Sequence, residues 1–187
     1  VQLRDARLGQ VQQVITQNVD ALHQAAGSKN VIDLHGRLDT VRCMKCGAPM
    51  TRVHMDELLH ELNPHIEKDA NHEFTPDGDA EIEAAADFRI PACPVCSGVL
   101  KPDVVFFGES VPQSRVEYAM ARLDEAEALV VAGTSLTVNS GLRFARRAAR
   151  AGKPIIIVNI GETKADELAT AKIEANTSLV LERLFID

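Results

Sequence analysis

The sequence predicts an α/β protein whose parallel sheet is covered on both faces, with a small metal-binding module inserted into it. Short apolar runs rich in Val and Ile alternate with helical patterns, as is typical of parallel strands. Two C-x-x-C pairs bracket the middle of the chain, which differs in character from the rest. The 187 residues, 45% of them apolar, suffice for one ordinary domain with a core and a small insert.

The first strand, at residues 11–15, breaks into a polar turn at residues 17–20. A short helical pattern over residues 21–26 then stops at Gly27, and a second strand at residues 31–34 ends on His35 and Gly36. Ligands of open α/β sheets lie beyond the carboxyl ends of strands, and a His beside an amide and a carboxylate can transfer protons. Ordinary polar turns remain the alternative for each strand end taken singly.

The second half of the chain continues the alternation of strands and helices. It predicts a short strand at residues 104–107, a helix at 112–125, a buried strand at 128–132, a helix at 139–151, a strand at 155–158 and an amphipathic segment at 179–185. Gly133-Thr134-Ser135 follows one strand and Asn159-Ile160-Gly161 follows another, so both turns suit a phosphate or ribose. An ordinary strand-to-helix turn explains each equally well. The segment 101–109 reads either as core or as an exposed edge that could pair with a peptide.

The insert holds all four cysteines of the chain, which are Cys43, Cys46, Cys93 and Cys96. Gly47 and Gly98 follow the two pairs, as tight knuckles require, and four thiolates make a closed, structural zinc site. Closing the 46-residue loop between the pairs costs about 3–4 kcal/mol, whereas structural zinc supplies roughly 10–16 kcal/mol. Disulfides would need an oxidising compartment, and two pairs fit a redox motif poorly.

Other features of the insert are a helical pattern through Met55 and Leu62 and an acidic run at residues 67–87, which we expect to be an exposed excursion. Four histidines lie nearby and are expected to be solvated rather than ligands: His54, His60, His65 and His72.

Composition excludes several classes of function. The formal net charge of -7 disfavours a protein that tracks nucleic-acid phosphates, although a local basic patch is present at Arg143, Arg146, Arg147 and Arg150. An apolar stretch of membrane-spanning length and a secretory signal are both lacking from these residues. Residues 1–9 read as the tail of a helix ending at Gly9, so we expect the sequence to begin within a domain.

Taken together, the motifs resemble those of the sirtuins, the NAD-dependent protein deacylases. The resemblance rests on these segments in order: T-Q-N-V-D at 16–20, H-G at 35–36, the two C-x-x-C pairs, K-P-D-V-V-F-F-G-E at 101–109, G-T-S-L at 133–136 and V-N-I-G at 158–161. They cover essentially the whole chain. The phrases F-F-G-E-S-V-P and N-I-G-E-T, the S-G after G-T-S-L-T-V-N and the long zinc loop look most like the class II mitochondrial and bacterial branch.

The resemblance implies a Rossmann-like NAD-binding domain at residues 1–36 and 102–187 and a zinc-ribbon domain at 37–101. It implies that an acyl oxygen attacks the ribose carbon as nicotinamide leaves, with His35 as general base for a ribose hydroxyl. The implied catalytic residues are His35, Asn18 and Asp20. The implied NAD-binding residues are Gln17, Asn18, Val19, Asp20, Gly133, Thr134, Ser135, Asn159, Ile160, Gly161 and Thr177. The implied acyl-lysine contacts are Val105, Phe107, Gly108 and Glu109, and the implied zinc ligands are the four cysteines.

One departure from the family concerns the glycine-rich G-A-G-x-S loop and the P-D-F-R segment, which sirtuins carry upstream of T-Q-N and which this sequence lacks. We therefore expect an N-terminally truncated chain that binds NAD poorly and turns over weakly by itself. The implied partner is an acyl-lysine protein, with no direct nucleic acid and no membrane. The implied location is the bacterial cytoplasm, or the mitochondrial matrix in a eukaryote.

Three alternatives stay open at this point. One is mono-ADP-ribosyl transfer to protein, in which another nucleophile captures the same ribose. Another is a zinc-bearing binding module without catalysis, which the acidity of the chain and the lack of basic and aromatic clustering near the cysteines disfavour. An NAD-dependent dehydrogenase is the third, and it lacks an apparent site for a hydride-accepting substrate.

Overall fold

The computed structural model describes residues 11–65 and 87–185 and divides the chain into two compact units. Unit 1 consists of Val1–Arg37 and Val104–Asp187, and unit 2 of Leu38–Asp103. The expected helix tail before Gly9, His72 and the acidic run up to residue 86 lie outside the described residues. None of the helices in the described part is long and apolar enough to cross a membrane.

Unit 1 contains two parallel sheets. Strands β1 (Val14–Thr16) and β2 (Val31–Asp33) form one of them, with Val14 opposite Val31. Strands β6 (Leu129–Ala132), β7 (Ile155–Val158) and β8 (Ala171–Ile173) form the other in that order. The predicted α/β class with parallel strands is confirmed, and β8 is a strand that the sequence pattern did not indicate.

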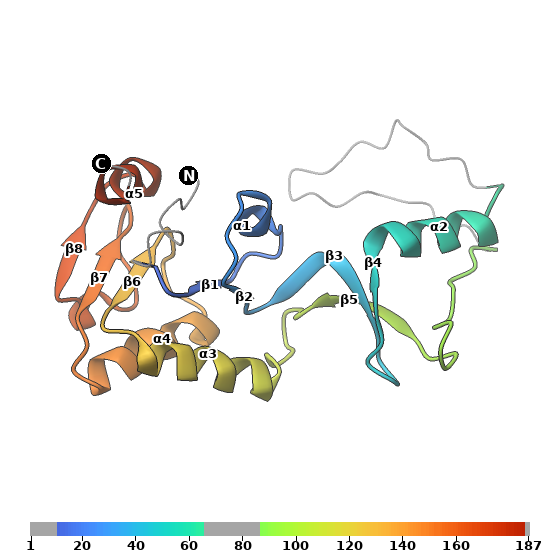
Figure 1. Ribbon diagram of the computed structural model, residues 1–187, viewed down its shortest axis with the longest axis horizontal. Coiled ribbons are helices and arrows are strands. Elements are labelled where there is room, and N and C mark those ends of the chain that lie inside the picture. Colours follow the sequence, from blue (N-terminus) through green and yellow to red (C-terminus); the bar gives the residue numbers. More distant parts are fainter. Residues whose placement is uncertain (1–10, 66–86, 186–187) are drawn as a thin grey trace. The chain divides into compact units, whose positions relative to one another are not determined.

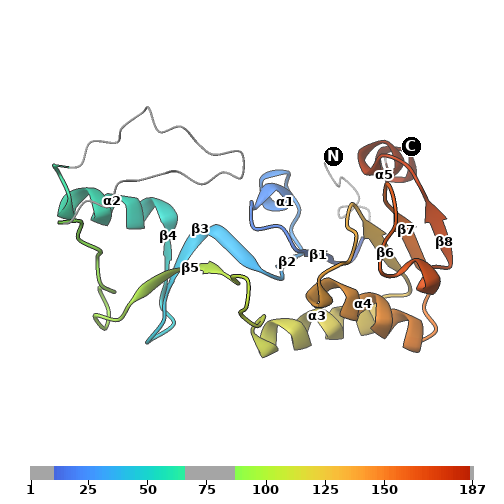
Figure 2. The same ribbon diagram turned by 180° about the vertical axis from the view of Figure 1, so that it is seen from behind.

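The helices of unit 1 are α1 (Leu22–Ala25), α3 (Gln113–Glu125), α4 (Asn139–Arg150) and α5 (Thr177–Phe185), with a 3-10 turn, η2, at Asp166–Leu168. Figure 1 shows α3 and α4 side by side below strands β6 to β8, and Figure 2 shows the same pair from behind. Their buried faces join Ile155 and Ile157 of β7 in one apolar core. An Arg147–Asp124 pair with contacts of 2.8 and 2.9 Å ties α4 to α3 across their exposed faces, so part of the predicted basic patch is neutralised.

Two details of the predicted strands are wrong. The run at 128–132 is not fully buried, since Val130 is 42% exposed. The reason is that burial alternates along β6: Val131 faces the core, whereas Val130 and Ala132 lie on the face that lines an open hollow. The apolar run at 104–107 is not a strand either: β5 spans Leu100–Val104, and the chain turns at residues 106–109.

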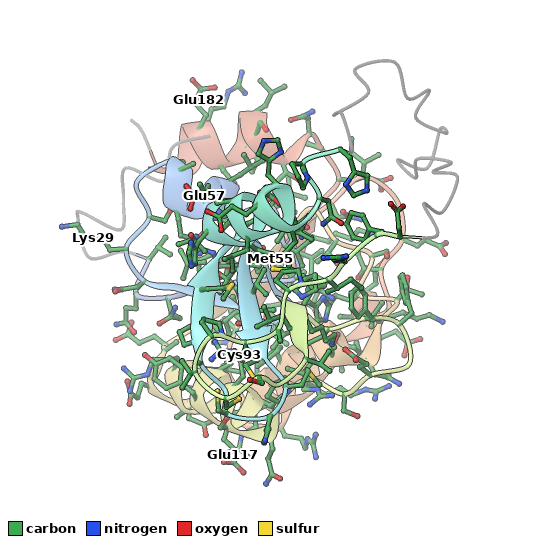
Figure 3. All side chains as sticks on the ribbon, turned by 90° about the vertical axis from the view of Figure 1, so that its right-hand side faces the viewer. Lys29, Met55, Glu57, Cys93, Glu117 and Glu182 are labelled. Atoms are coloured by element: carbon green, nitrogen blue, oxygen red, sulfur yellow. The ribbon has the colours of Figure 1, made fainter. Side chains whose placement is uncertain are left out.

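Unit 2 is built on a three-stranded sheet with the order β4-β3-β5, in which β3 spans Gly36–Cys43 and β4 spans Pro49–Thr51. The helix α2 (Arg52–Leu62) begins where the Thr51 hydroxyl accepts a hydrogen bond from the His54 backbone N–H at 3.1 Å, an ordinary N-cap. Figure 3 shows Met55 between α2 and the strands, where its side chain is buried. The pattern at 55–62 predicted this helix, whereas the β3–β4 hairpin has too little alternation to be read from the sequence.

The turn η2 is tied to β8 by Asp166. One carboxylate oxygen accepts from Lys172 Nζ at 2.7 Å, and the other accepts from the Thr163 hydroxyl at 2.6 Å. The bond from Lys172 and the bonds from Thr163 lower the pKa of Asp166 to about 2. Since this pKa lies below its value of 3.8 in an unfolded chain, the carboxylate stabilises the fold above pH 3.8, and the contribution is lost as pH falls through about 2.

We expect Asp166→Asn to lower the free energy of unfolding at pH 7, because the charge-assisted bond to Lys172 is lost. The difference from the wild type should shrink as pH falls from 4 towards 2, where about half of the wild-type carboxyls are protonated. Urea unfolding at pH 7, 4 and 2 measures it. Glu167→Gln, at the exposed neighbouring residue, is the matched control. A difference that is constant across this pH range would contradict the assignment.

Candidate functional site

The carboxyl ends of β1 and β2 lie side by side in unit 1. The backbone N–H of Leu34 donates to the Thr16 carbonyl at 2.9 Å, which continues the pairing past the end of β2. The Thr16 side chain accepts from the Asn18 N–H at 3.1 Å and so shapes the turn after β1. The two polar turns that the sequence places after these strands therefore meet at one edge.

His35 follows β2, and its ring has a partner at each nitrogen. Nδ1 lies 3.0 Å from the Gln17 carbonyl oxygen, and Nε2 lies 2.8 Å from the Ser140 hydroxyl. Because a carbonyl oxygen can only accept, the Nδ1 position carries the proton in this bond, and in the neutral ring Nε2 keeps its lone pair. The His35 backbone is also fixed, since its carbonyl accepts from the Val105 N–H at 2.8 Å.

Gln17 joins three elements of unit 1 at this point. Its backbone carbonyl, just beyond β1, holds the His35 ring, and its side-chain oxygen accepts from the Thr134 hydroxyl, after β6, at 3.2 Å. A Cβ atom placed on Gly141 of α4 would lie 2.8 Å from the Gln17 side-chain oxygen. A larger residue at 141 would displace the end of the Gln17 side chain, so the first turn of α4 is packed against Gln17.

The turn after β6 is fixed by its backbone angles and by hydrogen bonds within the protein. Gly133 has a positive φ of 64°, and its N–H donates to the Val158 carbonyl at 3.0 Å. Leu136 has a φ of 52°, a strained value for a branched side chain, and is held by its burial in the core. Its N–H donates to the Thr134 hydroxyl at 3.1 Å, which fixes that side chain within the turn.

The predicted adenosine side lies at the ends of β6 and β7. Asn159 is buried, and its side-chain amide donates to the carbonyl of Ile160 at 3.0 Å. The Thr177 hydroxyl donates to the Val158 carbonyl at 3.5 Å, and a Cβ on Gly133 would lie 3.6 Å from that hydroxyl. Gly133 and Thr177 are thus neighbours, although 44 positions separate them in the sequence.

An open hollow of about 1630 Å³ in unit 1 gathers many of the predicted site residues. The predicted residues that line it are Gln17, Asn18, His35, Val105, Phe107, Gly108, Glu109, Gly133 and Thr134. The others do not line it: Val19, Asp20, Ser135, Asn159, Ile160, Gly161 and Thr177. Ser140, for which no role in the site was predicted, does line it.

Two predicted residues have partners of their own within turns. One carboxylate oxygen of Asp20 accepts from the Leu22 N–H at 3.0 Å and thereby starts α1. A carboxylate oxygen of Glu109 accepts from the Phe106 N–H at 2.9 Å, and the Glu109 N–H donates back to the Phe106 carbonyl at 3.0 Å. This reciprocal pair closes the turn at 106–109, whose Phe107 side chain is completely exposed.

In unit 2 the four cysteines come together from the two knuckles. Their Sγ atoms all lie within 4.8 Å of one another, with 3.5 Å between those of Cys43 and Cys96 and 3.8 Å between those of Cys46 and Cys93. A tetrahedral zinc ion with Zn–S bonds of about 2.3 Å needs its sulfurs about 3.8 Å apart. The four cysteines are therefore positioned to hold a zinc ion, and all are free thiols rather than disulfides.

The backbone shapes the thiol cluster closely. A Cβ on Gly98 would lie 2.8 Å from Cys43 Sγ, so the second knuckle requires a glycine. The Cys46 N–H lowers the pKa of Cys43 to about 6, while side-chain hydrogen bonding with Cys46 raises the pKa of Cys96 to about 12.

Two of the nearby histidines lie outside the cluster, exposed beside carboxylates: His54 contacts Glu57 and His65 contacts Asp87.

Comparison with known proteins decides the family. The model of the Sir2 family matches residues 3–140. The chain belongs to the Sir2 family. An "NAD-dependent protein deacetylase" of Xanthomonas campestris is 54% identical over 175 residues, which are 92% of this chain and 59% of that protein. One from Bordetella bronchiseptica is 48% identical over 183 residues, covering 95% and 65%. The chain thus spans less than two thirds of the length of these Sir2 relatives.

Solved Sir2 structures agree with the fold. One described as "Sir2 bound to acetylated peptide" has a TM-score of 0.75 at 30% identity, over 97% of this chain and 66% of that one. Another, described as "Sir2-p53 peptide-NAD+", has a TM-score of 0.74 at 30% identity, over 97% and 65%. The mixed α/β fold and the family membership inferred from the motifs are confirmed.

Sequence reasoning missed Ser140 and Gly141. They are separated from Gln17 and His35 by more than 100 positions, so no local spacing reveals the contact. The only hint was that a small S-G pair opens a helix just after the G-T-S turn. Small residues at the start of a helix are common, and the hint does not by itself point to a site.

Proposed function

We propose that the chain serves NAD-dependent deacylation of protein lysines. The observation that carries the proposal is the His35 ring, which is held at both nitrogens in a hollow that also receives the Gly133-Thr134 turn. A general base fixed beside a backbone turn suited to phosphate or ribose is the arrangement that this reaction needs. The Xanthomonas and Bordetella relatives, both named as NAD-dependent protein deacetylases, support it.

NAD, when bound, supplies a ribose whose carbon takes the acyl oxygen as nicotinamide leaves. His35 takes a proton from a ribose hydroxyl at Nε2, while its Nδ1–H stays on the Gln17 carbonyl. Gln17 and Asn18 face the nicotinamide end, assisted by Val19 and Asp20. The turn Gly133, Thr134 and Ser135 takes the phosphate and ribose portion, and the adenosine side is taken by Asn159, Ile160, Gly161 and Thr177.

The acyl-lysine substrate binds along the turn after β5 in this proposal. Val105 and Phe107 wall the acyl chain, and Gly108 and Glu109 lie along the peptide backbone. The full exposure of the Phe107 ring supports this role, since an apolar ring without protein cover gains from burial against an apolar chain. A solved relative described as "Structure of Sir2Tm bound to a propionylated peptide" supports an acyl-peptide partner.

The remaining assignments follow from the same proposal. Residues 1–36 and 102–187 form the NAD-binding domain, and residues 37–101 form a zinc domain whose metal has a structural role. Four cysteine ligands support that role, because they leave no open position for a substrate. A reducing compartment, the cytoplasm of a bacterium, suits four free thiols and the bacterial relatives.

A chimera tests the proposal. In it the 175 matched residues of the Xanthomonas relative are replaced by those of this chain, and nicotinamide release from NAD is measured with an acetyl-lysine peptide. We expect release that depends on the acetyl group, with an unmodified lysine peptide as the control. NAD labelled in the ribose distinguishes the alternatives: label in a small acylated product supports deacylation, and label retained on protein supports ADP-ribosyl transfer instead. No release with either peptide would contradict both.

A further inference from the structure

Ser140, in the first turn of α4, contacts the catalytic end of the His35 ring. Its hydroxyl lies 2.8 Å from Nε2, and its side chain is only 8% exposed. Both residues line the same hollow of unit 1. The serine is therefore a buried polar group whose hydroxyl is directed at the nitrogen through which a base would act.

The first turn of α4 is also packed against Gln17. Gly141, the next residue, is packed so closely on Gln17 that a Cβ there would lie 2.8 to 2.9 Å from three atoms of the Gln17 side chain. The backbone carbonyl of the same Gln17 holds the opposite nitrogen of the His35 ring. The first turn of α4 and the residue after β1 thus contact the two nitrogens of the His35 ring.

The direction of the two hydrogen bonds follows from the chemistry of the partners. The Gln17 carbonyl can only accept, so Nδ1 carries the proton, and in the neutral ring Nε2 can only accept. The Ser140 hydroxyl, which can rotate to suit its partner, therefore donates to Nε2. The lone pair of Nε2 thus accepts from the Ser140 hydroxyl. A ligand hydroxyl that displaces Ser140 can donate to the same lone pair.

We propose that Ser140 is a positioning residue, which keeps Nε2 of His35 aimed into the hollow and holds the place that a ligand hydroxyl takes during the reaction. The role assigned to the ligand hydroxyl rests on the proposed function, whereas the state of the His35 ring does not. Alanine differs from serine by the hydroxyl alone, so Ser140→Ala removes the bond without opening a large cavity. Ser140→Thr retains a hydroxyl on the same carbon.

The state of the ring can be measured on this chain itself by ¹⁵N NMR with labelled histidine. In the wild type we expect Nδ1 to carry the proton, and Nε2 to carry none and to accept a hydrogen bond. In Ser140→Ala the Nε2 resonance should move to the position of an unbonded nitrogen while Nδ1 stays protonated, and Ser140→Thr should restore the wild-type position. A protonated Nε2 in the wild type, or an Nε2 resonance unchanged by Ser140→Ala, would overturn the proposal. The first of these outcomes needs no variant and is decided even if a variant fails to fold.

Kinetics in the chimera test the consequence for the reaction. Loss of one positioning hydrogen bond is expected to lower kcat about five- to tenfold, while KM for NAD stays the same, and Ser140→Thr should recover most of the rate. Ser114→Ala, an exposed serine on α3, is the control for serine loss in general. An unchanged kcat in Ser140→Ala would overturn the role in catalysis. If the chimera releases no nicotinamide while the wild-type ring signals are as expected, the proposed function fails and the ring geometry stands.

Discussion

Replacing His35 by alanine in the chimera is expected to lower the rate of deacylation about 10²–10⁴-fold, which is the usual contribution of a positioned general base. The reason is geometric: Gln17 holds Nδ1, Nε2 faces the Ser140 hydroxyl that a ligand hydroxyl would replace, and alanine leaves no group there to take the proton. The fold should persist, since His35 is only partly buried and its backbone bonds to neighbouring elements are unaffected. Initial rates of product formation at saturating NAD and peptide measure the effect.

The matched control is His54→Ala. His54 lies on α2 in unit 2, exposed beside Glu57, and lines no part of the hollow. Its loss should leave the rate unchanged. Circular dichroism and thermal unfolding of both variants separate a loss of chemistry from a loss of fold. A His35→Ala protein that is folded and retains the wild-type rate would refute both the general-base assignment and the proposed function built on it.

Removing zinc is expected to have the largest effect on stability. Structural zinc supplies roughly 10–16 kcal/mol of binding free energy, as much as the whole stability of a typical domain, about 5–15 kcal/mol. The described core of unit 2 is small: beside the cysteines, its buried apolar side chains are Val41, Met55 and Pro91. A strong chelator should therefore unfold unit 2, and Cys93→Ser should prevent its folding at ordinary zinc concentrations.

The zinc content of the chain is measured with a chromophoric indicator after the metal is released, and one ion per chain is expected. NMR signals from residues of unit 2 report its unfolding. Met44→Ser is the matched control, because Met44 lies between two ligands in the first knuckle but is exposed and contributes no thiol. It should bind zinc as the wild type does. A chain without zinc whose unit 2 signals remain dispersed, or a stoichiometry near zero, would contradict the site.

Much of this molecule could be predicted because its signals are local. The apolar runs at 31–34 and 155–158 predicted β2 and β7, and the C-x-x-C spacing predicted the cluster of four thiols. The failures arise where tertiary context decides. Val130 looks buried by composition and is exposed because it lies on the face of β6 that lines the open hollow. The apolar residues after Val104 read as a strand, but Gly108, with a φ of 87°, turns the chain there.

The candidate site shows the same division. Strand ends carrying Gln17, His35 and Thr134 were visible in the sequence because each follows an apolar run. Their partners were not, since Ser140 and Gly141 reach Gln17 and His35 only through folding of the whole unit. The carboxylates of Asp20 and Glu109 accept hydrogen bonds from backbone N–H groups of their own turns, and motif matching does not reveal such local bonds.

The insertion of unit 2 into unit 1 has a consequence for the rate of folding. The segment 38–103 separates the two parts of unit 1, so the bond between His35 and Val105 closes a loop over the entire insert. In an unfolded insert that closure carries the entropy of a long flexible loop. Once the metal has drawn the knuckles together, β5 lies beside β3, and the two ends of the insert are neighbours from the start. Zinc should thus accelerate the folding of unit 1, although all four zinc ligands lie in unit 2. Refolding of unit 1 should slow when the metal is withheld.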